Sequence, residues 1–119
     1  MFDDAKPIFL QLAEKIADDI LRGTYAEDAQ VPSTNEFAAF YRINPATAGK
    51  GVNLLVDRGV LYKKRGIGMF VAPGARAMVT AERDRGLIAD FITPLIREAR
   101  ALGISTSELL AMIQKEAAQ

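Results

Sequence analysis

Two helix-start signals follow one another closely in this chain, and a short glycine-containing hairpin pattern comes directly after them. Residues 33–36, Ser-Thr-Asn-Glu, form a capping box, in which the serine hydroxyl accepts a hydrogen bond from the amide three residues on. Asn44 and Pro45 are typical of the start of a second helix, and only residues 42–43 separate the two helices. So short a turn makes the helices cross at a steep angle, which predicts a helix-turn-helix.

The hairpin pattern consists of strand-like runs at 60–63 and 69–72, joined through Lys64-Arg65-Gly66-Ile67-Gly68. The glycines permit the positive φ angles that a short hairpin needs, and Pro73 ends the second run. Because a hairpin this small is not stable alone, it must pack on the helices. We therefore expect a winged helix-turn-helix domain over residues 1–73.

The helices of this domain have apolar faces. Residues 7–22 carry apolar side chains at helical spacing, and residues 24–32 form a connection in which only Gln30-Val31 is suited to a short strand. In the second motif helix the inward side chains are Ala48, Val52, Leu55 and Val56. The first motif helix has four apolar residues, and we expect its inner face to be large and aromatic. These residues are Phe37, Ala38, Phe40 and Tyr41.

The C-terminal part, residues 74–119, predicts two further helices. A helical pattern runs over 75–101, and Pro94 removes a backbone hydrogen bond, so we expect a kink or break near Thr93. A second capping box, residues 105–108, opens the last helix. Part of the apolar stripe can pack back on the winged domain, but the stripe is longer than so small a domain covers. We therefore expect a second copy of the chain to cover the rest. The expected dimerisation residues are Phe91, Leu95, Leu102, Leu109, Leu110 and Ile113.

The fold class that follows is mainly α with a small β-wing: a winged helix-turn-helix domain and a two-helix C-terminal dimerisation segment. The chain has no cysteine and no histidine, which excludes disulfides, thiolate and imidazole catalysis and the usual zinc sites. Adjacent carboxylates such as Asp18-Asp19 point in different directions and are interpreted as solvated surface. We expect no enzyme activity, no metal and no cofactor. Without an apolar run of bilayer length or a signal peptide, the expected location is the cytoplasm, with no membrane partner.

Charge is unevenly distributed although the chain has 15 basic and 15 acidic residues. Residues 1–41 hold three basic and eight acidic residues, whereas residues 42–65 hold six basic residues and Asp57 alone. The positive charge therefore lies on the second motif helix and the hairpin, where a phosphate backbone would be met.

This pattern predicts a surface for double-stranded DNA, with the helix starts and wing on phosphates and the second motif helix in a groove. Lys64 and Arg65 would be interpreted as a solvated charged turn if they stood alone, but their position behind the motif favours phosphate contact. Gly49 and Gly51 are compatible with close approach to DNA, with close approach to a neighbouring helix, or with no role at all. The expected DNA-binding residues are Ser33, Thr34, Asn35, Asn44, Ala46, Thr47, Lys50, Lys64, Arg65 and Gly66.

Several of these motifs in this order, namely Val31-Pro32-Ser33, Asn44-Pro45-Ala46-Thr47 and Arg65 to Val71, resemble the N-terminal domain of GntR-family transcriptional regulators over about residues 7–72. The Leu102-Gly103-Ile104-Ser105 junction resembles the YtrA-type subfamily, in which two helices replace a large effector-binding domain and are thought to dimerise. Asn35 stands where the family commonly has an arginine, and Ala48-Gly49 where many members have arginine, serine or valine. Lys50 matches the basic residue of the subfamily.

The resulting hypothesis is a repressor of transcription that binds a palindromic operator as a homodimer, with half-sites about one helical turn apart. A small-molecule effector is unknown. The alternative is a winged-helix module that binds protein or RNA, which the net charge of zero favours.

Overall fold

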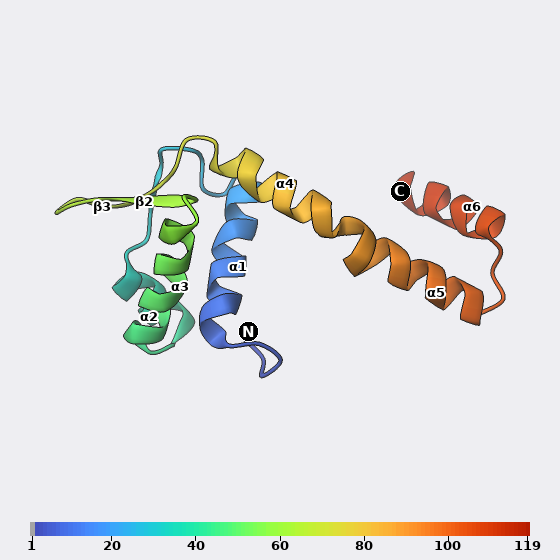
Figure 1. Ribbon diagram of the computed structural model, residues 1–119, viewed down its shortest axis with the longest axis horizontal. Coiled ribbons are helices and arrows are strands. Elements are labelled where there is room, and N and C mark those ends of the chain that lie inside the picture. Colours follow the sequence, from blue (N-terminus) through green and yellow to red (C-terminus); the bar gives the residue numbers. More distant parts are fainter. Residues whose placement is uncertain (1) are drawn as a thin grey trace. The chain divides into compact units, whose positions relative to one another are not determined.

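The computed structural model describes residues 2–119 and consists of two compact units, the first ending at Ala81 and the second running from Glu82 to Gln119 (Figure 1). This division lies later than the boundary after residue 73 that the sequence pattern indicated. The reason is that Ala75 and Val79 are buried in the core of the first unit, so the first turns of the following helix belong to it.

The first unit contains three complete helices, the first turns of a fourth and a three-stranded antiparallel sheet, which confirms the winged helix-turn-helix architecture. The complete helices are α1 (Ile8–Leu21), α2 (Thr34–Tyr41) and α3 (Pro45–Asp57). The strands β1 (Gln30–Val31), β2 (Leu61–Lys64) and β3 (Gly68–Val71) are ordered β1-β3-β2. The short strand expected at Gln30-Val31 therefore forms, and it pairs with the outer side of the hairpin through Gln30 opposite Phe70.

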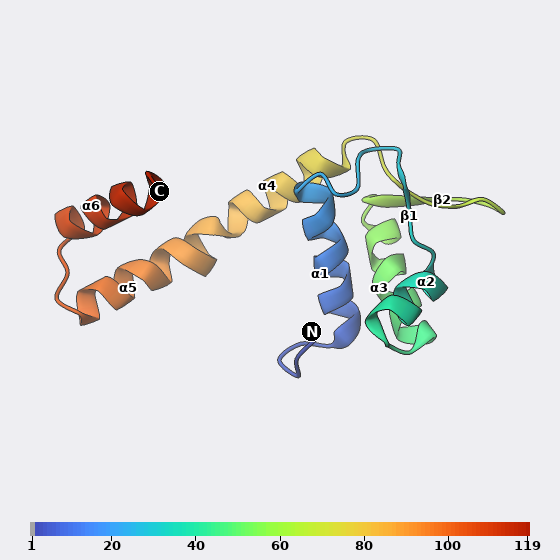
Figure 2. The same ribbon diagram turned by 180° about the vertical axis from the view of Figure 1, so that it is seen from behind.

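The core of this unit lies where α1, α2 and α3 meet the sheet. Figure 1 and Figure 2 both show α1 beside α3. Leu12, Ile16 and Ile20 of α1 are almost fully buried, as the apolar spacing of the sequence predicted. Val52 and Leu55 of α3 are buried in the same cluster.

The contact between α1 and α3 depends on Gly51. A Cβ atom at this position would lie 2.8 Å from the carbonyl oxygen of Phe9 and 3.3 Å from the side chain of Leu12. Of the readings that the sequence left open for this glycine, close approach to a neighbouring helix is therefore the one that the structure supports. Gly49 is different, because its nearest neighbour would be Thr34 Cγ2 at 3.6 Å, an ordinary contact.

The prediction that α2 has a large, aromatic inner face is only partly correct. Phe37 is buried and Tyr41 half-buried, but Phe40 is 73% exposed, so its placement in the core was wrong. The physical reason is the helical repeat: Phe37, Ala38 and Tyr41 share the inner face, and a residue three positions after Phe37 falls at its edge. Phe40 meets Tyr41 edge-on, with ring centroids 4.9 Å apart.

The helical pattern predicted over 75–101 is present in three segments: α4 (Ala75–Leu87), the π-helical segment η1 (Ile88–Ile92) and α5 (Thr93–Ala101). The interruption expected near Thr93 takes the form of a wider turn, in which the Thr93 amide donates to the Ile88 carbonyl five residues back. Pro94 then occupies the first turn of α5, where its missing amide hydrogen costs nothing.

The last helix, α6 (Thr106–Ala117), begins at the predicted capping box. Gly103 has a φ of +72°, and the Ile104 amide donates to the Ala99 carbonyl at 2.8 Å, which ends α5 in a left-handed turn. Leu109 is already buried within this unit, and its part in dimerisation stays a prediction. The other predicted interface residues are exposed, namely Phe91, Leu95, Leu102, Leu110 and Ile113.

Candidate nucleic-acid interface

The start of α2 presents a capped helix terminus to solvent. The Glu36 amide donates to Ser33 Oγ at 3.1 Å, and the Ser33 amide donates to Glu36 Oε1 at 2.9 Å. The first-turn amides of Thr34 and Asn35 have no intrahelical acceptor and stay available to a phosphate oxygen. Hydrogen bonds from the Ser33 amide and side chain lower the pKa of Glu36, which keeps a negative charge at this terminus.

The start of α3 is capped in a similar way. Asn44 Oδ1 accepts a hydrogen bond from the Ala46 amide at 2.8 Å, and Pro45 occupies the first turn. The amide NH₂ group of Asn44 remains a donor for DNA. This geometry fixes where α3 begins, and therefore which residues form its leading edge.

The turn between α2 and α3 is set by Arg42. This residue has a left-handed backbone, with a φ of +56°, and the amide of Ile43 donates to the Ala38 carbonyl at 3.0 Å. Such a conformation at a non-glycine residue is uncommon and occurs mainly at tight helix ends. It makes the turn as short as the sequence predicted.

The outer side of α3 carries small side chains near its start. Ala46 is exposed, whereas Thr47 and Gly49 are half-buried. Lys50 is exposed, but its Nζ lies 4.2 Å from the centroid of the Phe9 ring of α1, an attractive contact between a cation and an aromatic face. Lys50 therefore lies at the side of α3 that faces α1.

The wing ends in a tight turn that exposes positive charge. The Ile67 amide donates to the Lys64 carbonyl at 2.9 Å, and Gly66, with a φ of +76°, provides the left-handed conformation that the turn requires. Arg65 is exposed at this turn. Lys64 Nζ lies 4.5 Å from the centroid of the Phe70 ring, so its aliphatic stem is held along the wing.

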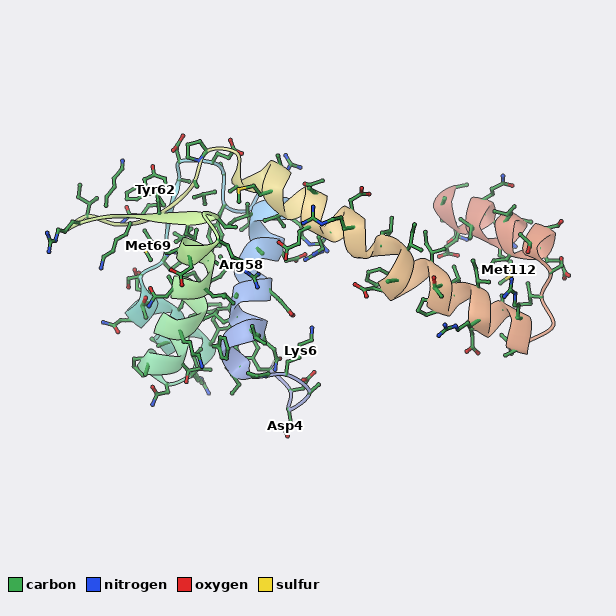
Figure 3. All side chains as sticks on the ribbon, viewed as in Figure 1. Asp4, Lys6, Arg58, Tyr62, Met69 and Met112 are labelled. Atoms are coloured by element: carbon green, nitrogen blue, oxygen red, sulfur yellow. The ribbon has the colours of Figure 1, made fainter. Side chains whose placement is uncertain are left out.

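Two side-chain contacts that the sequence did not indicate connect the wing to the segment before α2, one from the loop at Asp28 and one from Gln30 of β1. Tyr62, labelled in Figure 3, donates through its hydroxyl to Asp28 Oδ1 at 3.1 Å, and Gln30 Nε2 donates to the Ile67 carbonyl at 3.2 Å. Partial burial and then the Asp28 hydrogen bond raise the pKa of Tyr62. No sequence signal relates residues more than 30 positions apart.

All ten predicted DNA-binding residues belong to the first unit, and none of them is buried. They fall into three surfaces, which are the start of α2, the start and outer side of α3, and the tip of the wing. Among the helices of residues 2–119, none has the length and apolar composition needed to cross a bilayer.

Comparison with known proteins matches residues 9–71 to the bacterial regulatory proteins of the gntR family. The chain is 25% identical over 109 residues to the transcriptional repressor YtrA of Bacillus subtilis, covering 92% of this chain and 83% of YtrA. Other curated relatives, such as YurK and NagR of Bacillus subtilis, are much longer, and the chain spans 27% of their length.

Solved structures of GntR-family regulators also superpose on this chain. A GntR-family transcriptional regulator from Listeria monocytogenes superposes with a TM-score of 0.73 at 26% identity, covering 96% of this chain and 98% of that one. The DNA-binding domain of AraR, solved in complex with its operator ORX1, superposes with a TM-score of 0.57 at 30% identity over 60% of this chain and 93% of that one. Membership of a family of regulators agrees with the expectation that the chain is not an enzyme. The chain therefore belongs to the GntR family, as its motifs indicated.

Proposed function

We propose that this protein is a repressor of transcription in the cytoplasm, which binds a palindromic operator as a homodimer. The observation that carries the proposal is the grouping of the ten exposed or half-buried residues on one winged helix-turn-helix unit. The similarity of that unit to the AraR domain, solved with operator DNA, supports it.

The three surfaces have different tasks in this proposal. The start of α2 offers the unpaired amides of Thr34 and Asn35, and the starts of both α2 and α3 offer the positive end of a helix dipole, which suits phosphate oxygens. Lys64 and Arg65 at the wing tip supply full charges to a neighbouring stretch of backbone. The outer side of α3 enters the major groove, so base reading falls to it.

The homodimer rests on the second unit. Phe91, Leu102 and Leu110 are each more than half exposed, which is costly for large apolar side chains in water. Helices η1, α5 and α6 bury little among themselves, with Ala99 and Leu109 as the buried residues of this unit. A second copy of the same unit covers these side chains, and the resulting two-fold symmetry matches that of a palindrome.

A winged-helix module that binds protein or RNA is the second candidate, because the chain has a formal net charge of zero. The two candidates differ in their response to salt on duplex DNA. The test first selects duplex DNA that the protein retains from a genomic or random pool, which is then called the enriched duplex. If the protein contacts several phosphates, its affinity for this duplex should fall steeply and log-linearly with salt concentration. If no duplex from a genomic or random pool is retained at low salt, the repressor proposal is wrong.

Repression itself is tested with a reporter. A promoter that carries the enriched duplex next to its start site should lose expression when the protein is supplied. Increased expression would identify an activator instead.

A further inference from the structure

The leading edge of α3 is apolar where a base-reading helix usually carries long polar side chains. Pro45 and Ala46 are both exposed there. Of the polar side chains around them, Thr47 is half-buried, Asn44 Oδ1 accepts from the Ala46 amide, and Lys50 Nζ lies over the ring of Phe9. The first turn of α3 therefore presents a methyl group and a proline ring to any surface that it meets.

The next position on the same side of the helix has no side chain at all. Gly49 follows Ala46 by three residues, so the two are neighbours on the helix surface. A Cβ at Gly49 would find only Thr34 Cγ2 within 4 Å, at 3.6 Å, so packing within the unit does not demand a glycine here. The absent side chain lets the backbone of α3 lie close to a partner beside Ala46.

Base edges in the major groove offer one apolar feature, the 5-methyl group of thymine. In a helix-turn-helix the first residues of the second helix are those that contact base edges. We propose that Ala46, flanked by Pro45, reads the 5-methyl group of thymine. This inference rests on the proposed function, because it requires α3 to lie in the major groove. The specificity of the protein then depends on A·T pairs at the position facing the first turn of α3.

The test uses the full-length chain and duplexes enriched from a random pool. Each thymine of an enriched duplex is replaced in turn by deoxyuridine, which lacks only the 5-methyl group and keeps its hydrogen-bonding pattern. We expect replacement at one or two positions in each half-site to lower the affinity about fourfold, the effect of removing one buried methyl group.

The variant Ala46→Gly tests whether Ala46 is the residue that contacts the methyl group. This variant should bind the thymine and deoxyuridine duplexes equally, because the methyl group that makes the contact is gone. The ratio of the two affinities is the readout, since a general loss of helix stability affects both duplexes alike. Ala77→Gly, the same change at an exposed position of α4, is the matched control and should keep the full ratio.

Each other outcome overturns the inference in a recognisable way. Duplexes that are retained but insensitive to every deoxyuridine leave the proposed function standing and refute thymine reading. A ratio that persists in Ala46→Gly shows that other residues read the methyl group and refutes the assignment to Ala46. Failure to enrich any duplex removes the proposed function and this inference together.

Discussion

Gly51 of α3 lies so close to the main chain of α1 that a Cβ atom at this position would be 2.8 Å from the carbonyl oxygen of Phe9. Real Cβ atoms do not approach a backbone oxygen to this distance, and neither helix backbone can move without disturbing the core. The glycine therefore sets the spacing between α1 and α3, the helix proposed to read bases.

Gly51→Ala should destabilise the first unit by about 1–3 kcal/mol, the usual cost of overpacking. Gly49→Ala is the matched control. Its new methyl group makes an ordinary contact with Thr34, and alanine is favoured over glycine in a helix by about 1 kcal/mol, so the unfolding free energy should rise. Urea unfolding followed by circular dichroism measures both. Equal effects of the two substitutions would contradict the close α1–α3 contact.

Phe37 and Phe40 lie on the same short helix and should respond differently to truncation. Phe37→Ala removes a buried ring and should cost about 3–5 kcal/mol. Phe40→Ala removes a ring that is 73% exposed and should cost at most about 1 kcal/mol, from its edge contact with Tyr41. Thermal and urea unfolding test the pair, and a large loss for Phe40→Ala would place that ring in a packed environment.

Glu36 makes the stability of the first unit depend on pH in a defined direction. Its pKa in the folded chain is lowered by the hydrogen bonds with Ser33, so the carboxylate stabilises the fold above its ordinary pKa of 4.5. This contribution is lost as the pH falls below 4.5 and through the lower folded pKa. Glu36→Gln keeps a capping side chain but does not titrate. We expect the stability difference between the two chains to be constant near neutral pH and to change only in acid.

The wing residues should act on all DNA sequences alike. Replacing Lys64 and Arg65 by alanine should weaken binding to every duplex and reduce the slope of log affinity against log salt by about 0.9 for each lost phosphate contact. The control replaces Lys15 and Arg22, which removes the same charge from side chains paired with Asp19 and Asp18 on α1. An unchanged slope in the wing variant would mean that Lys64 and Arg65 do not contact phosphates.

The second unit should determine the oligomeric state. The full-length chain is expected to sediment at about twice its mass of 13.0 kDa. Phe91→Asp places a carboxylate on an exposed apolar face and should yield monomers, whereas Ala77→Asp, at an exposed position of the first unit, should remain dimeric. A dimeric Phe91→Asp chain would move the interface to another surface.

Much of the candidate site was predictable from sequence because local signals determine it. The capping boxes at Ser33 and Ser105 and the cap at Asn44 all form as expected, since a cap depends on residues within three or four positions. The turn glycine Gly66 was predictable for the same reason. Chain order then placed the two motif helices before a basic hairpin.

Other properties depended on contacts between distant residues. Sequence spacing gave α2 four apolar residues but did not show that Phe40 lies outside the core, because burial depends on which elements cover each face. Sequence spacing also left the role of Gly51 open, because that role depends on the contact with α1. Nor did it indicate the contact of Tyr62 with Asp28 or that of Lys50 with Phe9.

The sequence by itself determined the order of the elements, their caps and the separation of charge, since each of these is a property of neighbouring residues. The tertiary structure alone decided which side chains on α3 remain available to a partner. Packing against α1 occupies Gly51 and draws Lys50 toward Phe9, and it leaves Ala46 exposed at the start of the helix.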